Sequence, residues 1–241
     1  MYNLDASGLL DVWERGFNLS PPRRALALLA YEFPDTCQQE LAALPLGRCE
    51  TLLQRLRVQL FGVELAFVAS CPACASIVES TIDLSRMLPD ADAPQPQPLC
   101  LDEHGVTFRS PCLRDLIGLP GDAAAARRAL VSRCLLPAPA GRTATGLGEP
   151  LSDQALDAIS AAMRAADPAA AAELELECPD CNQRWQTGFD IAAFLWREID
   201  AWARRTLREV HALARAYAWS EQDVLALSPT RRQLYLELSR A

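Results

Sequence analysis

Two short segments of this chain repeat one another and place four cysteines in two C-x-x-C pairs. One opens with Cys71-Pro72-Ala73-Cys74 and the other with Cys178-Pro179-Asp180-Cys181, at an offset of 107 residues. They align without a gap as far as a shared apolar–Asp–apolar ending, and a bulky apolar residue, Val78 or Trp185, occupies the same place in both. Paired thiolates are typical ligands of structural zinc, which takes four in a tetrahedron. We therefore predict one structural zinc ion, held by Cys71, Cys74, Cys178 and Cys181.

Two other interpretations of the paired turns stay open. The turns could hold no metal and bury their thiols, or they could act as redox dithiols or form disulfides. Nine cysteines are an odd number for a disulfide framework, and in a reducing cytosol such pairs more often serve metal or redox chemistry. Glycine often follows the second cysteine of such a turn, where φ is positive. Here Ala75 and Asn182 stand in that place, so the first turn is expected to be the weaker half.

The remaining cysteines have no metal-ligand spacing, and we expect them to be small buried apolar residues. They are Cys37, Cys49, Cys100, Cys112 and Cys134. His104 lies near Cys100 and Cys112 and offers an alternative ligand set, although a turn histidine beside two acids is more often simply exposed. We expect His211 at the surface or boundary of a helix.

The apolar periodicity predicts an α+β fold that is mostly helical. Residues 1–62 form an N-terminal helical segment, in which Ser20 before two prolines starts a helix. Residues 63–88 and 173–191 alternate apolar and other residues around a C-P-x-C turn, so each predicts a strand–turn–strand hairpin. We expect these zinc-knuckle hairpins to join into one zinc-ribbon-like unit, packed with the N-terminal helices and a long C-terminal helix.

Residues 89–172, between the hairpins, are predicted to be an insertion with Pro-rich linkers at 89–98 and 137–150. Its predicted elements are a hairpin over 99–109, a helix over 123–136 capped by Asp122, and a helix over 153–166 capped by Ser152.

Residues 192–241 are predicted to form the C-terminal helices. Apolar residues spaced by three and four from Ile191 to about Trp219 define one face of a single long helix. Ser220 and Asp223 predict a capping box for a short helix. A last helix is expected over 230–240, with three residues for burial: Leu234, Leu236 and Leu238.

The long helix and its successors carry tryptophan and arginine, which are favoured anchors of protein interfaces. These helices hold more arginines than acidic residues, whereas the formal net charge of the chain is -8. Burial against the strands is one interpretation of the tryptophans. The other is a partner-binding surface formed by Trp196, Trp202, Trp219, Arg231 and Arg232.

Composition and motifs exclude several classes of function. The acidic net charge argues against broad nucleic-acid affinity. No apolar run reaches the roughly 18–20 residues of a membrane span, and Met1 to Glu14 lacks the basic start of a secretory signal. The chain has no H-x-E, glycine-rich phosphate loop or G-x-S-x-G, and four thiolates leave zinc no position for an activated water. We expect neither an enzyme nor a small-molecule substrate.

Four parts of the chain resemble the baseplate hub or hub-assembly-chaperone family of contractile-tailed phages, which also occurs in bacterial phage-tail-like contractile injection clusters. They are Leu9 to Gly16 (LLDVWERG), the two C-P-x-C turns, Phe189 to Trp196 (FDIAAFLW), and Trp219 to Pro229 with Arg231-Arg232. The resemblance implies a non-enzymatic role in building, or forming part of, a baseplate. It implies other hub, baseplate or spike proteins as partners, and a place in the bacterial cytoplasm during assembly or in the assembled particle.

Two further functions stay open at this stage. One is a zinc-ribbon regulator that binds nucleic acid through the arginine-bearing C-terminal helices, against which the acidic net charge counts. The other is a thiol oxidoreductase that uses the paired cysteines.

Overall fold

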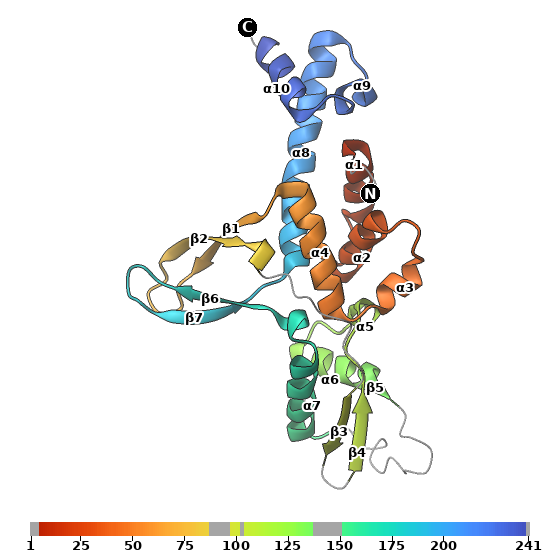
Figure 1. Ribbon diagram of the computed structural model, residues 1–241, viewed down its shortest axis with the longest axis vertical. Coiled ribbons are helices and arrows are strands. Elements are labelled where there is room, and N and C mark those ends of the chain that lie inside the picture. Colours follow the sequence, from red (N-terminus) through yellow and green to blue (C-terminus); the bar gives the residue numbers. More distant parts are fainter. Residues whose placement is uncertain (1–4, 87–96, 102–103, 137–150, 240–241) are drawn as a thin grey trace.

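The computed structural model describes residues 5–86, 97–101, 104–136 and 151–239 of the chain. In these residues the fold is α+β and mostly helical, with small antiparallel sheets, as predicted. Figure 1 shows the long helix α8 (Ile191–Tyr217) as an axis. Two β-hairpins project from one side of it, and the N-terminal helices cover the other.

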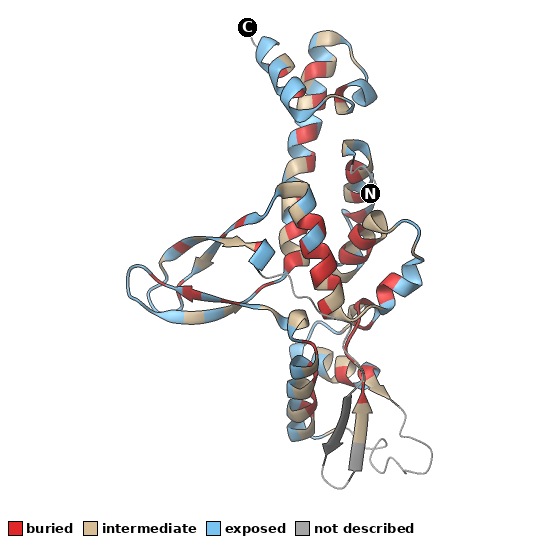
Figure 2. Ribbon diagram, in the orientation of Figure 1, coloured by how far each residue is buried: buried red, intermediate tan, exposed pale blue. Residues whose placement is uncertain are grey.

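The main core lies where the N-terminal helices meet the first half of α8 (Figure 2). These helices are α1 (Ala6–Gly16), α2 (Pro21–Glu32), α3 (Gln38–Ala43) and α4 (Leu46–Phe61). Leucines at helical spacing supply most of the buried surface; Leu28, Leu29 and Leu53 have no exposed area. Ser20 is the N-cap residue of α2 and prolines fill its first turn, as expected, although the serine side chain makes no capping hydrogen bond.

The two hairpins are separate two-stranded antiparallel sheets. Strands β1 (Glu64–Ser70) and β2 (Ile77–Asp83) form one, followed by the 3₁₀ turn η1 (Leu84–Arg86). Strands β6 (Glu173–Glu177) and β7 (Arg184–Gly188) form the other. In each hairpin the strand before the turn alternates exposed and buried residues, so one face packs inward while the other meets solvent.

The insertion forms a small unit with its own core, in which Phe108, Cys134 and Ile159 are fully or almost fully buried. Its elements are β3 (Gln97–Leu101), β4 (His104–Phe108), α5 (Leu113–Leu116), α6 (Ala123–Cys134), β5 (Leu135–Leu136), α7 (Asp153–Ala166) and the 3₁₀ turn η2 (Pro168–Ala171). Asp122 and Ser152 cap α6 and α7 as predicted. Most of the first Pro-rich linker and all of the second fall outside the described residues.

One predicted boundary in the insertion is wrong. The helix expected over 123–136 ends at Cys134, because Leu135 and Leu136 pair with Phe108 and Thr107 as the third strand of the sheet. The tertiary pairing therefore overrides the helical pattern of the sequence.

The C-terminal end of α8 carries α9 (Glu221–Leu225) and α10 (Pro229–Leu238), which enclose a small core of their own. The capping box of Ser220 and Asp223 is present as predicted. Of the three leucines expected to be buried in α10, only Leu236 is buried, while Leu234 and Leu238 are 54% and 66% exposed. Residues two apart in a helix point to different sides, so α10 buries Arg232 and Leu236, which are four apart.

Candidate metal centre

The two C-P-x-C turns have the same backbone structure. In the first, the N–H of Cys71 donates to the carbonyl of Ser76 and the N–H of Ala75 donates to Cys71, both at 2.9 Å. In the second, Cys178 donates to Gln183 and Asn182 donates to Cys178, also at 2.9 Å. Each bond in one turn has its counterpart in the other at the same offset in sequence. The repeat noticed in the sequence is therefore a repeat of structure.

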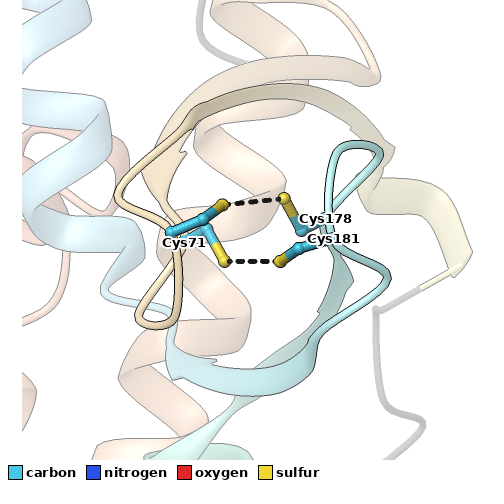
Figure 3. Close-up of side chains that lie close together, drawn as sticks. Cys71, Cys178 and Cys181 are labelled. Atoms are coloured by element: carbon cyan, nitrogen blue, oxygen red, sulfur yellow. Dashed lines mark hydrogen bonds between the residues drawn. The ribbon is translucent and has the colours of Figure 1, made fainter.

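The hairpin tips bring the four cysteines together from positions more than a hundred residues apart (Figure 3). Their four sulfur atoms all lie within 4.8 Å of one another. Two pairs of sulfur atoms make contact between the hairpins: Cys71 Sγ lies 3.6 Å from Cys181 Sγ, and Cys74 Sγ lies 3.6 Å from Cys178 Sγ. These cysteines are free thiols, since a disulfide would need about 2.0 Å. They lie close enough to hold a metal ion.

The sulfur spacing can be compared with a zinc site. With a Zn–S bond of about 2.3 Å, the edge of a tetrahedron of thiolates is ~3.8 Å. The two separations between the hairpins, 3.6 Å each, are close to that edge, and all four sulfur atoms lie within 4.8 Å of one another. The donor set is thus compatible in chemistry and in size with a four-thiolate zinc site.

A small apolar cluster packs against the inner two cysteines of the site. The first cysteine of each turn is buried, Cys71 with 2% and Cys178 with 0% of its surface exposed, and both pack with Val78 and Trp185. Val78 and Trp185 are the matching bulky positions of the repeat. Cys74 and Cys181, by contrast, are exposed. The inner pair of thiols and the two bulky side chains fix the distance between the hairpins.

Hydrogen bonds within the turns stabilise thiolate charge unevenly. The hydroxyl and backbone N–H of Ser76 lower the pKa of the Cys74 thiol to about 6. At the matching place, the backbone N–H of Gln183 lowers the pKa of Cys181, but hydrogen bonds with Cys74 and the other thiols, together with desolvation, raise it overall to about 12. Four adjacent thiols cannot all ionise unaided, so binding as four thiolates requires a cation among them.

The residue after the second cysteine lies in the left-handed region in both turns. Ala75 has φ 60° and Asn182 has φ 57°. Asparagine tolerates this conformation, whereas alanine, with its Cβ, adopts it at a cost. The first turn therefore carries local strain at the position that the sequence singled out.

The hairpin bases are anchored in the main core, next to the long helix. Leu65 and Phe67 of β1 and Leu174 and Leu176 of β6 all belong to that core. The chain leaves β7 directly into α8, and Asp190 caps the helix by accepting the backbone N–H of Ala193. The cysteine cluster thus connects both hairpins at their tips, while the core connects them at their bases.

None of the other cysteines whose side chains the structure describes belongs to this cluster. Cys49, Cys112 and Cys134 are buried, as expected, but Cys37 is exposed and the prediction for it is wrong, because Cys37 occupies the N-cap position of α3 at the surface. The alternative ligand set with His104 and Cys100 depends on side chains outside the described residues. Among the described residues, only the cysteines 71, 74, 178 and 181 group closely enough to hold a metal.

The residues proposed for partner binding are mostly engaged within the chain. Trp196 is buried beneath the guanidinium of Arg24, which lies 4.7 Å from its ring. Trp202 packs against the main core, and Trp219 stacks on Tyr217. Arg232 is buried and pairs with Glu209 at 2.8 Å. Arg231, in contrast, is exposed.

The sequence shows an excess of arginine in the C-terminal helices but not the helix face on which these arginines lie. Nor does the sequence reveal a partly buried ion pair in the insertion, where Arg109 donates to both carboxylate oxygens of Asp115. This pair lowers the pKa of Asp115 to about 2, against the desolvation that raises it. The spacing of the arginines along the long helix is a sequence signal for the helix face. No local sequence pattern marks the Arg109–Asp115 pair.

Comparison with protein-family models, with curated proteins and with solved structures finds no match to this chain. No helix in the described part of the chain is long and apolar enough to cross a membrane.

Proposed function

We propose that this chain is a non-enzymatic structural or assembly protein of the baseplate of a contractile injection system or phage tail, stabilised by one structural zinc ion. The convergence of four cysteine sulfur atoms within 4.8 Å of one another is the observation that carries the zinc assignment. The resemblance in sequence described above supports the assignment to a baseplate. A site filled by four thiolates offers zinc no open position for water, which suits a structural role.

Two of the segments that resemble the baseplate family, Leu9 to Gly16 and Phe189 to Trp196, meet where α1 packs against α8. One turn beyond the second of these segments, Asp200 of α8 accepts the indole N–H of Trp13 in α1 at 2.8 Å. Gly16 lies against the ring of Trp196, so close that a Cβ there would be 2.4 Å from it. A glycine at this place lets α1 approach α8, and both motifs therefore serve one packing interface. This contact supports treating the motifs as parts of a single unit.

In this proposal the zinc ion contributes folding free energy and fixes the two hairpins to each other. Because the second hairpin leads into α8, the metal also restrains that helix relative to the first half of the chain. The cysteines do no chemistry on a substrate. They hold a surface in place for other baseplate, hub or spike proteins.

The function is tested by deleting the gene and by purifying the particles. We expect deletion to abolish or impair assembled particles, and restoring the wild-type gene to recover them. If the chain co-purifies with intact particles it is a component, and if it is needed but absent from them it is an assembly chaperone. Particles that assemble and function without the gene would overturn the proposal. A purified protein that lacks metal and catalyses thiol–disulfide exchange would instead favour an oxidoreductase.

A further inference from the structure

The solvent-facing side of α8 carries a row of basic residues. The buried side of the helix follows helical spacing through Ile199, Ala203, Thr206, Val210 and Leu213. The opposite side is exposed and carries Arg197, Arg204, Arg208, His211 and Arg215. These five residues, here called the basic row, span ~27 Å at 1.5 Å per residue. Figure 1 shows that α8 extends beyond α4 toward α9 and α10, so the second half of this row lies on the projecting part of the helix.

The acidic residues of α8 neutralise only one member of this row, Arg204, which pairs with Asp200 at 2.9 Å. The partners of Glu198 and Glu209 lie outside the row. The pairs are Glu198 with Arg57, Asp200 with Trp13 and Arg204, and Glu209 with Arg232 and Arg205. Arg208 and Arg215 make no ion pair with any residue that the structure describes. The second half of the row, formed by Arg208, His211 and Arg215, is thus exposed and unpaired by the acidic residues of α8, on a chain of formal net charge -8.

We propose that the basic row is a docking surface for an acidic α-helix of a partner protein. Arg197, Arg204 and His211 are seven residues apart, and so are Arg208 and Arg215. Seven residues are close to two helical turns, or ~10.5 Å. A partner helix that repeats carboxylates every seven residues matches this spacing along its whole length, as charged flanking positions do in coiled coils. Exposed Leu207 and Ala201 lie near the row and add apolar contact.

The charges alone would also suit nucleic acid, but the surroundings favour protein. The aromatic side chains at this end of the molecule are used internally: Tyr217 and Trp219 stack at 4.8 Å, and Tyr235 packs edge-on against both. They are not arranged as a platform for stacked bases, which single-stranded nucleic acids need. Arginine is enriched at protein interfaces.

This inference rests on the proposed function, since it names the chemistry of a partner for a non-enzymatic assembly protein. It is tested with a fluorescent, helical, Ala-rich peptide that carries Glu at the first and fifth positions of each heptad. A peptide with Gln at those positions, which has the same length and no negative charge there, is the negative control. The variant is Arg208→Glu with Arg215→Glu. The control is Arg55→Glu with Arg164→Glu, which changes the charge equally at two exposed helical arginines outside the row.

We expect the Glu peptide to bind the wild-type protein, and the affinity to fall several-fold between about 50 and about 200 mM salt. The variant in the row should lose about tenfold or more in affinity, the control should lose little, and the Gln peptide should not bind. Absence of binding at low salt, or an equal loss in variant and control, overturns the inference. Tighter, row-dependent binding of a DNA duplex overturns it in favour of nucleic acid.

The two proposals fail separately. Zinc content and particle assembly by the wild-type protein test the proposed function, whereas the peptide measurement tests only the row. In particles, the row variant should keep its metal and fold but assemble less well than the control variant. If both variants assemble equally, the docking surface is wrong while the proposed function stands.

Discussion

At the scale of single residues, the two hairpin turns differ in one side chain that matters for stability. Ala75 and Asn182 share φ near 60°, but for alanine the left-handed conformation costs about 1–2 kcal/mol. Glycine removes that cost and keeps the turn. We therefore predict that Ala75→Gly raises the free energy of unfolding by about 1 kcal/mol, measured by denaturant titration of the metal-loaded protein.

Ala73→Gly is the matched control, because Ala73 lies in the same turn and is not among the residues with positive φ. There glycine only adds freedom to the unfolded chain, so the protein should lose roughly 0.5–1 kcal/mol. Changes of the same sign in both variants would show that the strain assigned to Ala75 is absent.

At the scale of elements, the junction between α4 and α8 gives the protein a specific pH dependence. Glu50 of α4 is half-buried, and its pKa is raised to about 8 by desolvation and by the charge of Asp190, against the backbone N–H of Ile191, which lowers it. An ordinary glutamate has a pKa of 4.5. Between these values the folded protein holds a proton that the unfolded chain has released, so this group lowers stability as pH rises from about 4.5 to about 8.

Replacing the Glu50 carboxyl group by an amide removes this pH-dependent contribution to stability. We predict that Glu50→Gln is close to wild type in stability at pH 4.5 and more stable by roughly 4 kcal/mol at pH 8, since each pKa unit of the shift corresponds to about 1.4 kcal/mol. The difference between the two unfolding curves is the measurement, because the pH dependence of metal binding is common to both proteins. The exposed change Glu64→Gln is the control. A difference that stays constant with pH, or that grows toward low pH, contradicts the assignment.

The elements were largely predictable because their signals are local. Apolar spacing located α8 and the flanking strands of both turns, and Ser152 and Asp122 marked the beginnings of two helices. Errors arose where a distant partner decides the outcome. The two leucines of β5 leave the helical pattern because β4 offers them hydrogen bonds, and Leu238 is exposed because α10 packs through a different face. No local pattern contains that information.

At the scale of the whole molecule, the candidate site was predictable because the same pattern occurs twice. One C-P-x-C turn would have given two ligands without a partner, whereas the gapless repeat also indicated which cysteines belong together and that Val78 and Trp185 share a role. The relative placement of the turns was not predictable, since it depends on how both hairpins pack beside α8. Which face of α8 carries the basic row to the surface was likewise not predictable, since it depends on how that helix packs.

The central claim is that the four cysteines bind one structural zinc ion on which the fold depends. Elemental analysis of the purified protein, together with its unfolding curve, tests this most directly. We predict one zinc ion per chain, lost together with several kcal/mol of stability in Cys178→Ser. Cys134→Ser, a change at an equally buried cysteine outside the cluster, should keep the metal. A wild-type protein without zinc, or Cys178→Ser with full metal content and an unchanged unfolding curve, would contradict the claim.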